Sequence, residues 1–249
     1  MEEKESKQKG WLNWLQDHEE NFNEELHLLL TQGVVKCLPS DGYIKGAGWF
    51  LRFADVEAGE WNLAHPFGSV NSYVQFLRDI PASTFFHLLV PIEDLETLKQ
   101  NGVPDPEERL IWHRDILKKP EKKLAETSSS LPPGFQGELK FFETPNEDGL
   151  WNLKGYLLKN NSIVSLVKPI HVTPHTVEVY IETAASFRGM GLGTWLLAEY
   201  RKRLRVKGFR MVYVSSETNF SSRMVAKKIG LEPYQVLARI PFSNPANSD

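Results

Sequence analysis

The sequence has almost no cysteine and no long apolar segment. Cys37 is the only cysteine among 249 residues, so no disulfide can form within the chain and no cysteine-based zinc cluster is available. This usage fits a reducing compartment. No apolar run approaches the roughly 18 residues of a membrane-spanning helix, and the charged N-terminus shows no apolar signal-peptide core. We therefore expect a cytoplasmic protein with no membrane partner and no metal.

An excess of positive charge is also missing. The net charge is −3, whereas proteins that bind a nucleic-acid backbone usually carry a basic excess. Residues 201–207 (RKRLRVK) are basic, but they end a predicted helix, where positive charge offsets the helix dipole. We expect no nucleic-acid partner. The hydrophobic fraction of 41% is ordinary for a globular protein, and the length allows one large domain or two small ones.

One segment divides the chain by its composition. Residues 118–134 (KKPEKKLAETSSSLPPG) are rich in Lys, Ser and Pro and lack apolar periodicity, which is typical of a linker or a long surface loop. We predict an N-terminal α/β domain at 1–130 and a second domain at 131–249. In the first, apolar patterns predict helices at 11–32, 71–80 and 92–102 and strands at 34–38, 48–53 and 84–92.

The second half has a more regular pattern. Four short apolar runs with polar connections predict strands, and they are followed by an alternation of helix and strand. This order predicts an α/β (α+β) fold with a mixed, mostly antiparallel sheet, in which an antiparallel run leads through a helix crossover to a parallel neighbour. The predicted strands are 137–142, 150–160, 162–170, 176–183, 209–216 and 235–242, and the helices are about 190–206 and 219–230.

Three glycines stand directly before the first of these helices, in residues 186–193 (SFRGMGLG). A helix N-terminus has about four backbone N–H groups without partners and a positive partial charge. Glycines there remove Cβ atoms, so that an anion can approach the amides, and Arg188 adds a fixed positive charge. The pattern predicts a phosphate or pyrophosphate site. The alternative is a turn that needs glycine only for its geometry.

Two familiar phosphate loops do not fit this segment. A P-loop ends in Gly-Lys-Ser/Thr, and a dinucleotide fingerprint needs a further glycine where this chain has Thr194 or Leu196. Residues 188–193 (RGMGLG) resemble instead the (Arg/Gln)-x-x-Gly-x-(Gly/Ala) loop of the GNAT (Gcn5-related N-acetyltransferase) superfamily. The stretch that contains Asn219, Ser222 and the turn at 229–231 is similar to that family's second segment. The resemblance covers about 137–242 and looks closest to a bacterial subgroup that includes antibiotic-modifying acetyltransferases.

The resemblance implies acetyl-CoA as co-substrate. Its pyrophosphate would lie on the glycine loop and its pantetheine arm along the preceding strand, which splays from its neighbour. For residues 1–130 we expect a degenerate relative of the same fold that contributes to the acceptor site. The implied cofactor contacts are Ile181, Glu182, Thr183, Arg188, Gly189, Met190, Gly191, Leu192, Gly193, Thr194, Asn219 and Ser222.

Acetyl transfer to an amine needs a neutral nucleophile, a stabilised oxyanion and a proton for the departing thiolate. Glu178 and Glu182 are four apart on one strand, so they share a face, and Glu178 is the preferred base. The alternative for each is a solvated or ion-paired side chain. A backbone N–H of the same strand could hold the oxyanion. The tyrosine that often protonates the thiolate in the family is replaced by Ala226, which leaves as candidates Ser215, Ser216, Ser222, Tyr234 or water.

These residues predict an N-acetyltransferase that acts on a small-molecule amine by direct attack, since the C-terminal half has no cysteine to carry an acetyl group. The alternatives are a protein acetyltransferase, which acts on a lysine or an N-terminus, and a non-catalytic acyl-CoA-binding module. The family often ends with two strands after its second segment, but only one fits here. We expect the missing strand to come from the N-terminal domain or from a partner chain, and the protein to be a monomer or a homodimer.

Overall fold

A computed structural model describes most of both halves of the chain. The predicted helix at 11–32 and most of the predicted linker lie outside the described residues. The chain divides into two compact units: unit 1 comprises residues 1–110 and 236–249, and unit 2 comprises residues 111–235. The described residues are 35–38, 47–55, 60–77, 80, 86–115, 131–132, 134–145, 151–172 and 176–242.

This division differs from the predicted boundary at 130. Two strands, β5 (Glu108–Asp115) and β11 (Leu231–Phe242), contribute residues to both units. A change of composition marks where the chain becomes polar, whereas a compact unit is defined by which strands pair. The end of the chain therefore belongs to unit 1.

Unit 1 is built on strands in the order β1–β2–β3–β4–β11. β3 and β4 are parallel, while the other neighbouring pairs are antiparallel. The predicted strands of this unit are confirmed, and the predicted helix at 71–80 is shorter in the structure. β3 was not predicted, because Pro66 interrupts its apolar pattern. The elements are β1 (Val35–Leu38), β2 (Gly48–Asp55), β3 (Glu60–Phe67), α4 (Val70–Val74), β4 (Phe86–Pro91), η2 (Ile92–Asp94) and α5 (Leu95–Gln100).

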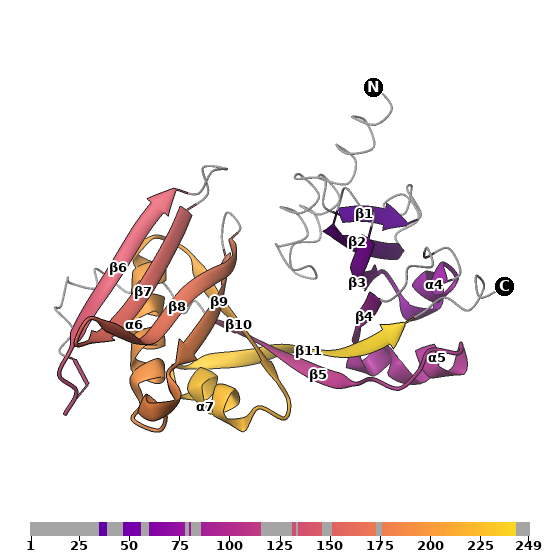
Figure 1. Ribbon diagram of the computed structural model, residues 1–249. Helices are drawn as coiled ribbons and strands as arrows, with labels where there is room; N and C mark the ends of the chain where they lie inside the picture. Colours follow the sequence, from indigo (N-terminus) through magenta and orange to yellow (C-terminus); the bar gives the residue numbers. More distant parts are fainter. Residues whose placement is uncertain are drawn as a thin grey trace. The chain divides into compact units, whose positions relative to one another are not determined.

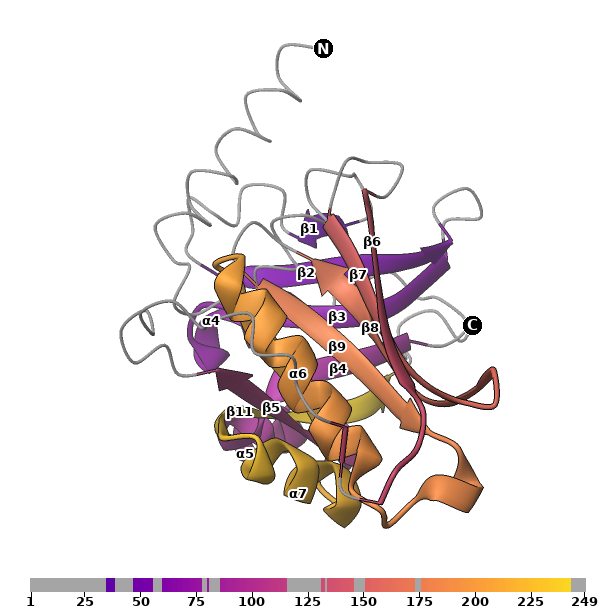
Figure 2. The same ribbon diagram turned by 90° about the vertical axis from the view of Figure 1, so that its left-hand side faces the viewer.

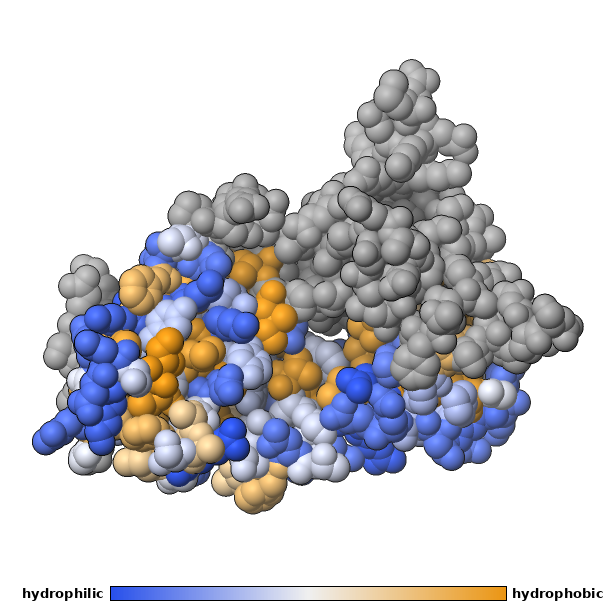
Figure 3. All heavy atoms as spheres, viewed as in Figure 1, coloured by the Kyte–Doolittle hydropathy of each residue, from blue (hydrophilic) through white to orange (hydrophobic). Residues whose placement is uncertain are grey.

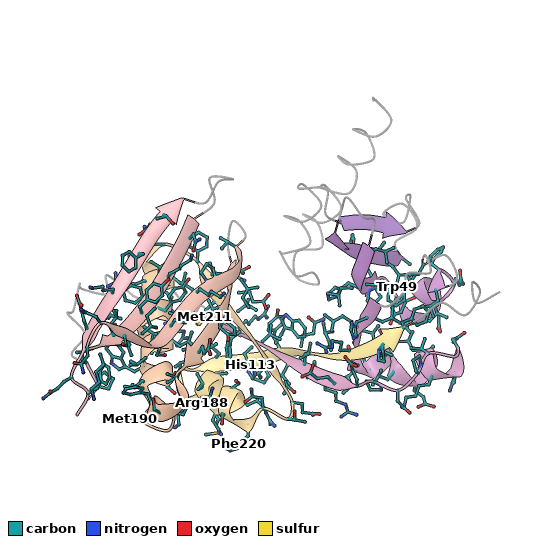
Figure 4. All side chains as sticks on the ribbon, in the orientation of Figure 1. Trp49, His113, Arg188, Met190, Met211 and Phe220 are labelled. Carbon is teal, nitrogen blue, oxygen red and sulfur yellow. The ribbon has the colours of Figure 1, made fainter. Side chains whose placement is uncertain are left out.

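The core of unit 1 forms around Trp49, which is fully buried (Figure 4). Its indole Nε1 donates a hydrogen bond to the carbonyl of Tyr73 at 2.9 Å, and the two rings meet edge to face. The Tyr73 phenol donates in turn to the carboxylate of Asp94. A buried indole and phenol need such partners, so these bonds fix α4 and η2 against β2.

Unit 2 has the strand order β5–β10–β9–β8–β7–β6 (Figure 1). Strands β6 to β9 form an antiparallel run, and β9 is parallel to β10. The predicted mixed, mostly antiparallel α/β fold is confirmed. The elements are β6 (Glu138–Pro145), β7 (Trp151–Lys159), β8 (Ser162–Val172), β9 (Thr176–Thr183), η3 (Ala185–Phe187), α6 (Leu192–Val206), β10 (Arg210–Ser216) and α7 (Phe220–Lys228).

The strand beside β10 is β5, which precedes the predicted linker. The strand that the C-terminal half lacks is therefore supplied by the N-terminal half of the same chain. β5 was not predicted, because Leu110, Ile111 and Trp112 are three consecutive apolar residues between charges and give no alternation.

The helix α6 packs across β7, β8, β9 and β10 (Figure 2). Its buried residues, among them Leu196, Tyr200 and Leu204, recur every four positions and form one apolar stripe. The Tyr200 phenol donates to the carbonyl of Leu153 at 2.8 Å. The helix ends before Gly208, whose φ of +85° suits a left-handed C-terminal stop.

An ion-pair cluster ties β5 to α6. The Asp115 carboxylate is buried and accepts hydrogen bonds from Arg201 at 2.5 Å and from Arg205 at 2.6 and 2.7 Å. Burial acts to raise the pKa of this carboxyl, but the bonds and charges of Arg205 and Arg201 outweigh it, so the pKa is lowered. β5 is therefore held to unit 2 by charge as well as by strand pairing.

Candidate active site

The parallel strands β9 and β10 are paired only where they begin. Their register comprises Thr176 with Arg210, then Val177 with Met211, and last Glu178 with Val212. Within these two described strands, residues 179–183 and 213–216 have no partner in each other. On its other edge β9 stays paired with β8 as far as Thr183. Backbone groups along one edge of β9 are thus open to an extended ligand.

The glycine loop lies at the end where these strands separate. Gly189 and Gly191 have φ values of +81° and +76°, in the left-handed region that favours glycine. A Cβ at either position would meet no atom within 4 Å, so the space beside the loop is open. In the first turn of α6 only Trp195 reaches a carbonyl four residues back, that of Gly191 at 3.0 Å. The preceding N–H groups therefore have no acceptor in the helix.

The third glycine, Gly193, is required for packing. A Cβ on Gly193 would lie 2.8 Å from Thr183 Oγ1, which is itself 2.9 Å from the hydroxyl of Ser165. The missing side chain lets α6 approach β9 closely. The two explanations considered for the glycines therefore apply to different residues: open space at Gly189 and Gly191, helix–strand packing at Gly193.

Charge and apolar surface meet around this loop. Arg188 is exposed and its Nε donates to the carbonyl of Thr183 at 3.1 Å, which holds the guanidinium at the end of β9. Met190 and Phe220 are 53% and 69% exposed, and in the view of Figure 4 all three labelled side chains lie at the same end of unit 2. A ligand with phosphates and an apolar arm needs such a combination.

Asn219 begins the second helix at this end. Its side-chain oxygen accepts a hydrogen bond from the N–H of Ser222 at 3.0 Å, which caps α7. Both residues were predicted to contact the cofactor, and the structure places them directly after β10.

The two predicted carboxylates lie on the face of β9 opposite its buried valines, as their spacing indicates. Glu178 is half-buried and stands at the last paired position, where the strands begin to separate. Glu182 is exposed and accepts a hydrogen bond from the Tyr180 phenol at 3.2 Å. This bond is the main cause of the raised pKa of Tyr180.

The same face of the sheet carries apolar and charged side chains together. Lys168 lies 5.4 Å above the ring of Tyr180, and Phe142, Ile163 and Ile170 are each about half exposed. Figure 3 shows orange side chains among blue ones over this part of the molecule.

The candidate proton donors lie in different surroundings. The hydroxyl of Ser216 lies 2.9 Å from that of Thr218, whereas Ser215 is buried and its hydroxyl is 3.1 Å from His113 Nε2 on β5. Tyr234 is partly exposed, with the Arg114 guanidinium over its ring.

Two buried residues of this region were missed from the sequence. His113 is 6% exposed, and its pKa is lowered by burial and then by the charge of Arg223. Its Nδ1 has no hydrogen-bond partner among the described residues. The ring of Tyr213 lies 6.4 Å from that of His113, and its phenol hydrogen-bonds Ser222. His113 was missed because its strand, β5, was not predicted. Tyr213 was missed because it stands within the apolar run of β10, where it looks like an ordinary core residue.

Within the described ranges, no three His, Cys, Asp or Glu residues gather where they could hold a metal ion. In the same part of the chain, no helix has the length and apolar character needed to cross a membrane.

Residues 122–231 match the model of the Acetyltransferase (GNAT) family. This segment is a GNAT acetyltransferase domain. The matched region covers β6 to α7 and so contains the glycine loop and the separated strands. The predicted superfamily is confirmed, and membership of the antibiotic-modifying subgroup stays a prediction.

Solved structures resemble the fold of the GNAT domain together with the rest of the chain. A tandem GNAT protein from the clavulanic acid biosynthesis pathway is 13% identical, with 98% of this chain and 97% of that chain covered and a TM-score of 0.60. A Drosophila protein is 12% identical, with 96% and 88% covered and a TM-score of 0.59. A GCN5-related N-acetyltransferase-like protein from Streptococcus suis is 13% identical, with 89% and 93% covered and a TM-score of 0.54. At these sequence identities, the similarity to the solved structures concerns the fold alone. A comparison with curated proteins found no match to this sequence.

Proposed function

We propose that the GNAT domain transfers an acetyl group from acetyl-CoA to the amine of a small molecule. The observation that carries the proposal is that the gap between β9 and β10 opens at the same end as the glycine loop. An extended pantetheine arm would pair with the free edge of β9, and the pyrophosphate would accept hydrogen bonds from the amides that begin α6.

Each part of the cofactor then has its own contacts. The pantetheine arm lies along Ile181, Glu182 and Thr183. The pyrophosphate lies on residues 188–194, where Arg188 supplies a charge that amides alone cannot. Asn219 and Ser222 reach the cofactor from the start of α7. Gly193 contributes its N–H and, by its packing on Thr183, keeps the helix close to the strand.

The amine attacks the thioester directly, and a carboxylate accepts its proton. Glu178 is the better base of the two, because it is half-buried at the position where the strands separate, whereas Glu182 is exposed to solvent. We expect Glu178→Gln to lower kcat/KM by about 100-fold or more, the usual contribution of a general base. Glu182→Gln is the matched control and is expected to change kcat/KM by less than about 5-fold. The reverse order of effects would assign the base to Glu182.

The reaction is tested by following CoA release from acetyl-CoA with a panel of small amines. Acceleration by at least one amine, with acetylated amine as product, is the expected result. If acetyl-CoA binds but no amine accelerates CoA release, the chain is a non-catalytic acyl-CoA-binding module. If only lysine-containing peptides or peptide N-termini are acetylated, it is a protein acetyltransferase.

We further propose that unit 1 is a degenerate copy of the same fold that does not bind CoA. It repeats the order of a strand, a helix crossover and a parallel strand in β3, α4 and β4, and the tandem GNAT protein covers nearly the whole chain. However, α4 has only five residues and is preceded by the single glycine Gly68. Isothermal titration is expected to give one CoA per chain, and a second site of similar affinity would contradict this assignment.

A further inference from the structure

The sheet of unit 2 has one face covered by α6 and a second face that points the other way (Figure 2). Leu153 of β7 and Val167 of β8 belong to the core on the α6 side. Side chains alternate along a strand, so the neighbouring residues Lys154 and Lys168 point to the second face. Both lysines are exposed there.

Lys154 and Lys168 occupy facing positions on neighbouring strands. Each adjoins the final pair of the antiparallel ladder between β7 and β8, so the two lysines come next in its register. Like charges that face each other across two strands destabilise the sheet. An anion bound between the two ammonium groups would remove this repulsion.

An aromatic residue stands on each side of the two lysines. Phe142 of β6 is paired with Lys154, and Tyr180 of β9 is paired with Lys168. The Lys168 ammonium lies 5.4 Å from the centroid of the Tyr180 ring. Phe142 and Tyr180 are 54% and 40% exposed, so each presents apolar surface to solvent. These four residues, which we call the lysine row, offer two positive charges bounded by apolar rings.

The lysine row shares its face with the carboxylate proposed as the base. Glu178 stands two residues before Tyr180 on β9, between valines that are buried on the α6 side. Two residues along a strand and one strand across correspond to about 8 Å between Glu178 and Lys168. The negative charge of this pair lies on β9 and the positive charge on β8. The face therefore complements a molecule that carries an amine at one end and an anion at the other.

We propose that Lys154 and Lys168 bind a carboxylate of the acceptor. The acceptor is then an amine with an apolar or aromatic body and a carboxylate about 8 Å from the nitrogen. This inference rests on the proposed function, because the amine of the same molecule is the one that is acetylated beside Glu178. Its nitrogen bonds to the acetyl carbon and its proton passes to the base. The carbon–sulfur bond breaks with its electron pair on sulfur, which takes up a proton from water as coenzyme A leaves. A polycationic amine is disfavoured, since the two ammonium groups repel it.

Two acceptors that differ in one group test the substrate class. 4-(Aminomethyl)benzoate and 4-methylbenzylamine have the same reacting amine and the same ring, but the second has a methyl group in place of the carboxylate. We expect kcat/KM to be at least about 10-fold higher for the carboxylate, through a lower KM, as for one charge-assisted bond. Phenylalanine carries its carboxylate next to the amine, too close to reach the lysines, and is expected to gain nothing over phenethylamine.

Substitutions in the lysine row locate the effect. Lys154→Met and Lys168→Met keep an unbranched side chain and remove its charge. Each is expected to raise the KM for 4-(aminomethyl)benzoate by about 10-fold, with kcat unchanged, and to leave the KM for 4-methylbenzylamine as it is. The matched control is Lys140→Met on β6, which removes an exposed lysine that pairs with Glu138 at 2.9 Å. It is expected to change neither KM.

A binding measurement decides the site without turnover. 4-(Aminomethyl)benzoate is titrated into the CoA-bound protein by calorimetry, and binding is expected to weaken about 10-fold in each of the two lysine variants. Binding that does not depend on these lysines overturns the inference, and so does an equal kcat/KM for the two benzylamines. Both results leave the proposed function standing if some amine is acetylated. Absence of CoA release with every amine overturns the proposed function, whatever the calorimetry shows.

Discussion

Gly191→Glu is expected to abolish acetyl-CoA binding while unit 2 stays folded. Gly191 precedes α6 and has a φ of +76°, so any other residue is strained there by about 1–2 kcal/mol. No atom lies within 4 Å of the added Cβ, so the change creates no clash. The new carboxylate would stand at the helix N-terminus, where it binds the amides meant for the pyrophosphate and repels that group. We expect the Kd for acetyl-CoA to rise by more than about 100-fold, the effect of two lost charge-assisted bonds.

Two controls separate charge from strain. Gly191→Ala has the same backbone strain without the charge, and it is expected to retain binding within about 5-fold. Gly208→Glu adds the same side chain at a glycine with φ of +85° and open space, but at the other end of α6. It is expected to bind as the wild type does. Titration calorimetry gives the affinities and circular dichroism checks the fold. Undiminished binding by Gly191→Glu would remove the proposed cofactor site.

The glycine loop could be predicted because its evidence is local. The three glycines, Arg188 and the start of the helix all fall within residues 186–193. The segment around Asn219 added a second motif of the same family at the expected separation. The antiparallel run β6 to β9 was equally accessible, since each strand is a short apolar run bounded by a polar connection.

The residues that were missed depend on pairing between distant segments. β5 joins β10 across about 100 residues, and its apolar residues are consecutive, so neither its existence nor its neighbour can be read locally. His113 meets Ser215 only through that pairing. Tyr213 lies in a strand that was predicted, but its position at the start of the gap depends on where β9 and β10 cease to pair.

The same pairing makes the stability of the protein sensitive to Asp115. Asp115→Ala is expected to lower the free energy of unfolding by about 3–5 kcal/mol, because it leaves the guanidinium groups of Arg201 and Arg205 without their shared buried carboxylate. Denaturant unfolding of the full chain measures the change. The control is Glu138→Gln, which removes an exposed pair with Lys140 at 2.9 Å. Its expected cost is below about 1 kcal/mol.

The pH dependence gives an independent check, and its sign follows from the lowered pKa of Asp115. A carboxyl whose pKa is lower when folded stabilises the protein above its unfolded value of about 3.9. That contribution is lost as the pH falls through the folded value. The difference in stability between wild type and Asp115→Asn should therefore be constant near neutrality and should shrink as the pH falls below about 4. A difference that stayed constant in acid would mean that packing, and not the charge of Asp115, holds β5 to α6. Because β5 comes from the N-terminal half, charge-dependent retention of this strand would make the GNAT domain incomplete without the residues that precede its family match.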